Sequence, residues 1–245
     1  MDYYIISLFL IIICGIFSAS ASAKVRKAYQ KYGTMQSASY MTGYDTASRL
    51  LRVNGVQDIA VGRVRGSLTD HYHPTKKIVN LSESVYGDTS IASVAVAAHE
   101  IGHVMQKEKG YLPYKIRTML VPITNFGSYL ALPLVLLGFI LDMFVVSTQN
   151  TSIGLYLAIA GVVLYGMSTL FAFVTLPVEL DASRRAKKML LAEGILTQEE
   201  IPYADKMLDA AAMTYVASLA TSLVYFLRFV LWVMMLFGGN SRRRR

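Results

Sequence analysis

Five consecutive residues, His99-Glu100-Ile101-Gly102-His103, carry the clearest chemical signal in the chain. Histidines four residues apart lie on one face of a helix, so both imidazoles can bind one Zn²⁺ ion, and the glutamate can act as a base toward water on that metal. Chance would produce this pattern only about 0.002 times in a chain of this composition. We therefore predict His99 and His103 as ligands of one zinc ion per chain and Glu100 as the catalytic base. The alternative is two histidines that are merely hydrogen-bonded inside a core.

A catalytic zinc site needs a third protein ligand and leaves its fourth position to water. A histidine six residues after the motif would mark one large subclass, but Lys109 stands there. We expect an acidic ligand further along the chain, and Glu179 is the best candidate because it directly follows an apolar run and opens a predicted helix. The alternative for Glu179 is an ordinary carboxylate in a first helical turn, which the helix dipole favours. The competing acids are Glu108, Glu193, Glu199 and Glu200.

The composition indicates a membrane protein. Of the 245 residues, 54% are hydrophobic and 16% are charged, whereas soluble domains average about 25% charged residues. The net charge of +8 could suggest nucleic acid, but the basic residues cluster beside apolar segments, as orientation determinants do. We therefore expect no nucleic-acid partner. The single cysteine, Cys14, excludes a disulfide framework and a cysteine-built metal site.

Apolar runs divide the chain into regions. Residues 1–23 form a predicted transmembrane anchor with its N-terminus outside, because basic residues follow the run rather than precede it. Cleavage as a signal peptide is the alternative. Residues 119–176 form a predicted transmembrane hairpin with a polar connection at 147–152, and residues 215–245 hold a fourth apolar segment and a basic tail at 242–245. A spanning fourth segment would send four arginines outside, so a re-entrant segment remains open.

The hairpin places two polar regions, 24–118 and 177–214, on the same membrane face, and the charge rule makes this face cytoplasmic. We expect the two regions to build one catalytic domain at the membrane surface, because His103 and Glu179 both lie near apolar runs in the sequence. Local patterns also predict individual elements within these regions. These are helices at 42–53 and 178–193, a helix capped within 88–90 that runs to about 107, strands at 58–64 and 77–81, and a helix begun by a capping box at Thr197 and Glu200.

Three blocks of sequence carry a resemblance to a known family. They are Ser67-Leu68-Thr69-Asp70-His71-Tyr72-His73-Pro74, Val96-Ala97-Ala98-His99-Glu100-Ile101-Gly102-His103 and Pro177-Val178-Glu179-Leu180-Asp181-Ala182-Ser183. Over nearly its whole length the chain resembles the bacterial YugP-like neutral zinc metallopeptidases, and its layout is similar to that of the HtpX-type membrane proteases. The resemblance implies zinc bound by His99, His103 and Glu179, with Glu100 as the base. The expected fold is a mainly α membrane protein with about four transmembrane helices and a small α+β zincin-like catalytic domain.

The surroundings of the site leave several roles open. Gluzincin-type sites commonly carry an acid one turn after the glutamate ligand, where it supports a histidine ligand. This chain has Ser183 in that position, and Asp181 is better placed to pair with Arg184 or Arg185. A tetrahedral oxyanion needs a donor besides the metal, and the candidates are His71, Tyr72, Tyr86 and Arg184. For His71 and His73 the alternative is an ordinary place in an exposed turn.

These features together predict a membrane zinc endopeptidase that hydrolyses peptide bonds of membrane-associated or unfolded proteins. Its expected partners are a polypeptide substrate and the lipid bilayer, with a membrane-protein partner or a homo-oligomer left open. The strand around 64–69 could bind an extended peptide at a sheet edge. Two alternatives come from other classes: a catalytically silent metal-binding membrane scaffold, and a zinc amidase acting on non-peptide substrates.

Overall fold

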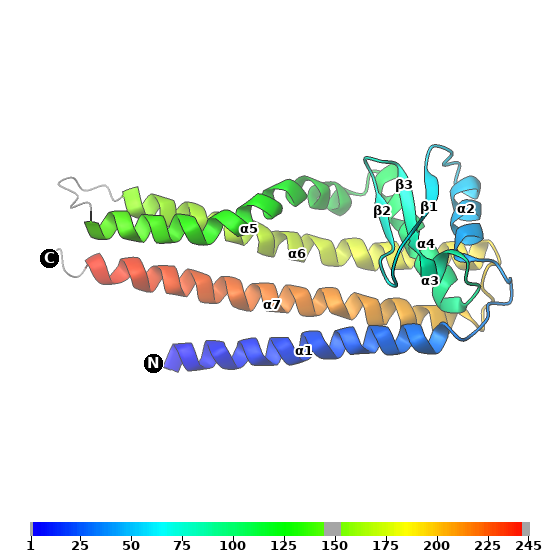
Figure 1. Cartoon of the computed structure of the whole chain (residues 1–245), viewed down its shortest axis with the longest axis horizontal. Helices are drawn as coiled ribbons and strands as arrows, with labels where there is room; N and C mark the ends of the chain where they lie inside the picture. Colours follow the sequence, from blue (N-terminus) through cyan, green and yellow to red (C-terminus); the bar gives the residue numbers. More distant parts are fainter. Residues whose placement is uncertain (1, 145–152, 242–245) are drawn as a thin grey trace. The chain divides into compact units, whose positions relative to one another are not determined.

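The computed structural model describes residues 2–144 and 153–241. The predicted polar connection at 147–152 and the basic tail at 242–245 lie outside the described residues. The fold is mainly helical with one small sheet, as the sequence predicts (Figure 1). In chain order the elements are α1 (Asp2–Tyr32), α2 (Gly43–Val53), β1 (Ala60–Val64), β2 (His71–His73), β3 (Ile78–Ser82), α3 (Glu83–Tyr86), α4 (Ile91–Glu108), α5 (Leu112–Phe144), α6 (Ile153–Ala192) and α7 (Ile201–Ser241).

Two compact units share the chain, and each is built from segments that are far apart in the sequence. The first unit comprises Met1–Ser18, Ile116–Thr175 and Ala217–Arg245, and the second comprises Ala19–Lys115 and Leu176–Val216.

Long apolar helices supply the first unit, and they continue into segments of the second. Within the described residues, three helices are long and apolar enough to cross a membrane: Ile5–Tyr32, Ile153–Ala192 and Ile201–Phe237. A fourth span results if Leu112–Gly127 and Tyr129–Leu141, which meet at 46°, are counted as one. Side chains such as Phe9 and Ile16, which are 64% and 66% exposed, present a surface that suits lipid better than water.

Small residues bring two of these helices close together. A Cβ atom at Gly138 of α5 would lie 2.3 Å from the carbonyl oxygen of Gly154, and one at Gly161 of α6 would lie 2.6 Å from that of Ala131. Close backbone approach through small residues is the usual way in which membrane helices pack. Helices α5 and α6 therefore pack closely against each other at these two positions.

Two helices are longer than the sequence patterns predict. The prediction that a helix opens at residue 178 is wrong, because α6 runs without interruption through Pro177 to Ala192. Packing of the buried Val178, Ala182 and Ala186 compensates for the backbone hydrogen bond that a proline removes. Helix α7 begins after the predicted capping box, in which Thr197 N donates to Glu200 Oε2 over 2.8 Å, and no glycine or proline ends it between residues 203 and 237.

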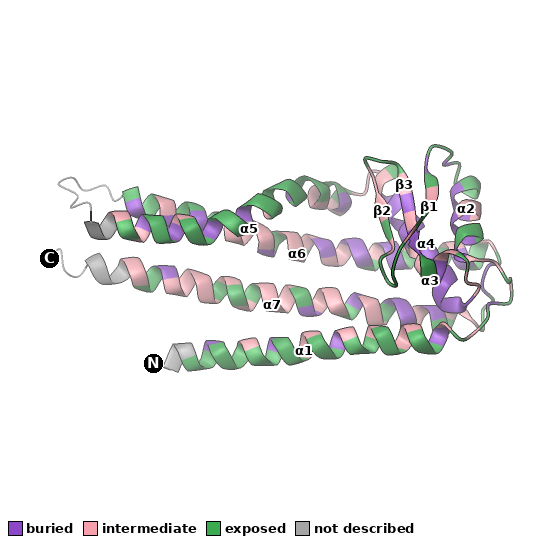
Figure 2. Ribbon diagram, in the orientation of Figure 1, coloured by how far each residue is buried: buried purple, intermediate pink, exposed green. Residues whose placement is uncertain are grey.

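The second unit packs α2, α3 and α4 around a three-stranded sheet of order β1-β3-β2. Strand β1 pairs in parallel with β3, and β2 pairs with β3 in antiparallel orientation. The two predicted strands are therefore confirmed, and β2 adds a third. Thr42 caps α2 through the reciprocal hydrogen bonds of a capping box with Asp45. Figure 2 shows that α4 is buried along most of its length, whereas α1 is largely exposed.

Candidate metal centre

Helix α4 presents the histidine motif from the core of the second unit. The helix starts where the sequence predicts, because the Ser90 hydroxyl caps it by accepting a hydrogen bond from Ser93 N over 3.2 Å. Its C-terminal end is followed by Gly110, whose φ is +64°. Residues on nearly all faces of α4 are buried. A helix held in this way fixes its side chains more firmly than a loop would.

Gly102 lets α6 approach α4 at the centre of the motif. A Cβ atom at this position would lie 2.5 Å from the carbonyl oxygen of Ala182, which is much closer than van der Waals contact allows. The glycine thus brings the backbone of α6 against the turn of α4 that holds both histidines. As a result Glu179, three residues before Ala182, reaches the imidazoles.

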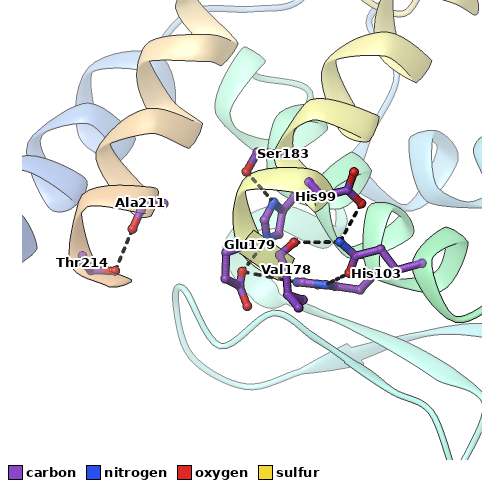
Figure 3. Close-up of polar contacts among 9 residues, drawn as sticks. His99, His103, Val178, Glu179, Ser183, Ala211 and Thr214 are labelled. Atoms are coloured by element: carbon purple, nitrogen blue, oxygen red, sulfur yellow. Dashed lines mark hydrogen bonds and ion pairs between the residues drawn. The ribbon is translucent and has the colours of Figure 1, made fainter. Parts of the chain in front are cut away.

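Three side chains converge at this contact, as Figure 3 shows. Nε2 of His99 lies 3.2 Å and Nε2 of His103 lies 3.4 Å from the same carboxylate oxygen, Oε2 of Glu179. With zinc bonds of about 2.0–2.1 Å, neighbouring ligand atoms of a tetrahedral site stand about 3.3 Å apart. Two imidazole nitrogens and one carboxylate oxygen also form a donor set found in zinc hydrolases. The three residues therefore fit a zinc ion in both chemistry and spacing.

The position of Glu179 in the chain differs from the prediction. It lies well inside α6 rather than in a first helical turn, so the alternative of a carboxylate favoured by the helix dipole is wrong. Glu179 is only 2% exposed, and a buried carboxylate is stable only with partners that match its charge. The two imidazoles are such partners.

Each histidine is held from behind by a polar side chain. Nδ1 of His99 lies 3.1 Å from the hydroxyl oxygen of Ser183, which stands where gluzincins carry an acid. Nδ1 of His103 lies 3.0 Å from Oε1 of the fully buried Gln106. Partners of this kind fix the orientation of imidazole ligands.

The surroundings of Gln106 decide which nitrogen of His103 faces a metal. Its amide nitrogen donates to the carbonyl oxygen of Val178 over 2.7 Å and to Oδ2 of Asp181 over 3.0 Å. Both partners are acceptors, so the amide oxygen must face His103, and Nδ1 of His103 must carry the proton. Nε2 is then left with a free lone pair, which is the state that a metal ligand needs.

Gln106 was not predicted as part of the site, although a polar residue three positions after His103 on a buried helix was a usable signal. The predicted pairing of Asp181 is confirmed, because Nε of Arg185 donates to Oδ2 of Asp181 over 2.6 Å. The same carboxylate also accepts from Gln106. Asp181 therefore supports the orientation of His103 through Gln106 in addition to pairing with arginine.

Glu100 is 7% exposed and lines a cavity together with His99 and Glu179. Burial raises the pKa of Glu100 to about 7. His99 opposes this shift, the carboxylates of Glu179 and Asp70 add to it, and a backbone hydrogen bond from Tyr72 again opposes it. A carboxyl group poised near neutral pH can both accept and return a proton.

The side chains of the four candidates for oxyanion stabilisation make contacts outside the cavity lining, although the backbone of Tyr72 bonds Glu100. Nδ1 of His71 lies 2.8 Å from the carbonyl oxygen of Thr69. The hydroxyl oxygen of Tyr72 accepts a hydrogen bond from Nζ of Lys107 over 3.3 Å. The ring of Tyr86 packs 5.0 Å from that of Tyr44, and Arg184 lines a different cavity. None of the four side chains is among the described residues that line the cavity at Glu100. Tyr215 and Arg26 line it instead, and no local pattern marked them.

The competing acids are also placed away from the histidines. Glu108 and Glu199 are exposed. Glu193 pairs with Arg49 over 3.5 Å, and Glu200 caps α7 and accepts from Ala38 N over 2.7 Å. The acid that the structure brings to the two histidines is Glu179.

The fold and site define a mainly helical protein with an HExxH-plus-glutamate centre in a small α+β unit. Residues 6–234 match the family described as "Putative neutral zinc metallopeptidase", and the chain belongs to this family. It is 42% identical over 211 residues to "Putative membrane protease YugP" of Bacillus subtilis (strain 168), a match that covers 86% of this chain and 89% of that protein. No solved structure matches the chain.

Proposed function

We propose that this protein is a multi-pass membrane zinc endopeptidase that hydrolyses peptide bonds of membrane-associated or unfolded polypeptides. The observation that carries the proposal is the convergence of His99, His103 and Glu179, whose ligand atoms all lie within 4.8 Å of one another, in a cavity that also holds Glu100. Family membership and the 42% identical membrane protease support the same reaction class. Intact Glu100 argues against a catalytically silent scaffold.

His99, His103 and Glu179 would hold the metal. When bound, a zinc ion lowers the pKa of water to about 7 and polarises the scissile carbonyl group. Glu100 would take the proton from the attacking water and deliver it to the leaving amine. Gln106 and Ser183 keep the imidazoles oriented, so the ligands do not need to rearrange during the reaction.

The proposed setting is the cell membrane, with the catalytic unit on the cytoplasmic face. Helices long and apolar enough to cross a membrane support the first part. The basic residues Lys24, Arg26 and Lys27, which directly follow the first apolar run, support the second. The lipid bilayer and a polypeptide substrate are therefore the partners that we propose.

The test is hydrolysis of unfolded casein and of a membrane-protein substrate by the full chain, purified and reconstituted in lipid nanodiscs. We expect cleavage by the wild type and a loss of at least about 100-fold in Glu100→Gln. Glu108→Gln is the matched control, because Glu108 is an exposed glutamate on the same helix. Cleavage of neither substrate by the wild type, or equal rates in wild type and Glu100→Gln, would contradict the proposal.

A further inference from the structure

The cavity beside the candidate ligands has two chemically different sets of walls. Its volume is about 360 Å³, within the range of pockets that bind small ligands or side chains. His99, Glu100 and Glu179 line the reactive part. Apolar residues in the other walls are Val25, Leu68, Val96, Met207, Leu208 and Ala211, and the polar residues there include Ser22, Arg26, Asp70, Thr214 and Tyr215. Figure 3 shows Ala211 and Thr214 on α7, separate from the helix that carries Glu179.

Two polar groups beside Leu68 and Ala211, those of Asp70 and Thr214, already have partners, whereas Ser22 and Arg26 of α1 also line the cavity. The Thr214 hydroxyl donates to the carbonyl oxygen of Ala211 over 2.7 Å. The carboxylate of Asp70 accepts from Ser82 N over 2.7 Å and from the Ser82 hydroxyl over 3.0 Å. A substrate side chain that enters between α7 and the loop before β2 therefore meets mostly carbon atoms. A charged or strongly polar side chain would lose hydration there without compensation.

Leu68 gives a second, independent indication. Its φ is +57°, a conformation that costs energy for a non-glycine residue, and its side chain is 41% exposed. The loop around it is closed by a hydrogen bond that the Thr69 hydroxyl donates to the carbonyl oxygen of Arg65 over 3.0 Å. A strained backbone that holds a leucine at the edge of the cavity suggests that the leucine has a role in binding.

We propose that Leu68 and the α7 wall at Ala211 form a subsite that selects an apolar side chain next to the scissile bond. This inference rests on the proposed peptidase function and adds the class of substrate residue. Leu, Ile, Met and Phe are the expected occupants, and Asp and Lys are disfavoured. Burial of such a side chain should change kcat/KM by about 10- to 100-fold.

The experiment maps cleavage sites in a mixed peptide library by mass spectrometry for the wild type and three variants. Leu68→Asn makes the wall polar and keeps the fold, because asparagine tolerates a positive φ. Ala211→Leu adds bulk to the opposite apolar wall. The control is Tyr40→Asn, which replaces another exposed apolar residue, with a φ of 54°, at a position outside the described cavity lining. Affinity of leucine- and aspartate-containing peptides for Glu100→Gln gives a readout that needs no turnover.

The subsite is supported if apolar residues are enriched by at least about 10-fold at one position flanking the cleaved bond. This enrichment must also fall in Leu68→Asn and Ala211→Leu but not in Tyr40→Asn. Cleavage without apolar enrichment, or enrichment that neither variant changes, overturns the subsite and leaves the proposed function standing. If the wild type cleaves nothing, the proposed function fails, and the binding measurement decides the subsite alone. Equal affinity for leucine- and aspartate-containing peptides then overturns it.

Discussion

Replacement of Gln106 by methionine should weaken zinc binding about 10- to 100-fold, the usual effect of removing a group that orients a histidine ligand. Methionine has a similar length and keeps the packing of a fully buried side chain. It cannot accept the proton on Nδ1 of His103, which lies 3.0 Å from Oε1 of Gln106. The imidazole then loses the contact that fixes its tautomer and ring orientation.

The contacts of Gln106 also set the expected effect on stability. Two contacts, those to His103 and Val178, lose their partner outright, whereas Asp181 keeps its hydrogen bond with Arg185. At about 1 kcal/mol for each net hydrogen bond, Gln106→Met should lower the free energy of unfolding by about 2 kcal/mol. Gln106→Glu should cost more, because a carboxylate oxygen would replace the amide nitrogen and face two acceptors, the carbonyl oxygen of Val178 and Oδ2 of Asp181.

The assay is competition for zinc with a chromophoric chelator, on full-length protein in nanodiscs, with thermal unfolding measured in parallel. Ser93→Ala is the matched control, because Ser93 is a buried polar residue of the same helix whose hydroxyl bonds Asp88, away from the ligands. We expect it to lower stability without changing zinc affinity. If Gln106→Met binds zinc within about twofold of the wild type, the inference that Gln106 orients His103 is refuted.

Three further predictions concern other parts of the second unit. Gly102→Ala should force α4 and α6 apart, because its Cβ would lie 2.5 Å from the carbonyl oxygen of Ala182. We expect the free energy of unfolding to fall by about 1–3 kcal/mol and elemental analysis to find less zinc per chain. Full zinc at unchanged Tm would show that the close contact is not needed. Asp70→Asn removes a negative charge that raises the pKa of Glu100. Because a lower pKa keeps Glu100 deprotonated in more acidic solution, the acidic limb of the kcat/KM profile should move to lower pH. A move to higher pH would contradict this prediction. Thr42→Ala removes the cap of α2 and should lower the free energy of unfolding by about 1 kcal/mol, with zinc affinity unchanged. A loss of zinc would contradict this expectation and link α2 to the metal centre.

The sequence was sufficient for the site where a short pattern carries the chemistry. The spacing of His99 and His103 predicted their common face, and the position of Glu179 after the hairpin predicted its role as the third candidate. The strands followed from the β-branched content of short segments, and α2 followed from helical periodicity closed by Asn54 and Gly55. In each case local physics determines the structure.

The sequence was not sufficient where distant segments decide the outcome. Pro177 suggested a helix start, but the buried contacts of Val178 and Ala182 carry α6 through the proline. Gln106 gains its meaning only when Val178 and Asp181 of α6 lie beside it. The apolar walls of the cavity combine α1, α7 and the loop before β2, and no single pattern reports such a combination.

The most direct test of the central claim is zinc content per chain in wild type, Glu100→Gln, Glu179→Ala and Glu108→Ala, measured by elemental analysis together with casein hydrolysis. We expect about one zinc per chain in wild type, Glu100→Gln and Glu108→Ala, and substantially less in Glu179→Ala. Hydrolysis should occur only in wild type and Glu108→Ala. Full zinc in Glu179→Ala would remove Glu179 from the metal centre and contradict the account.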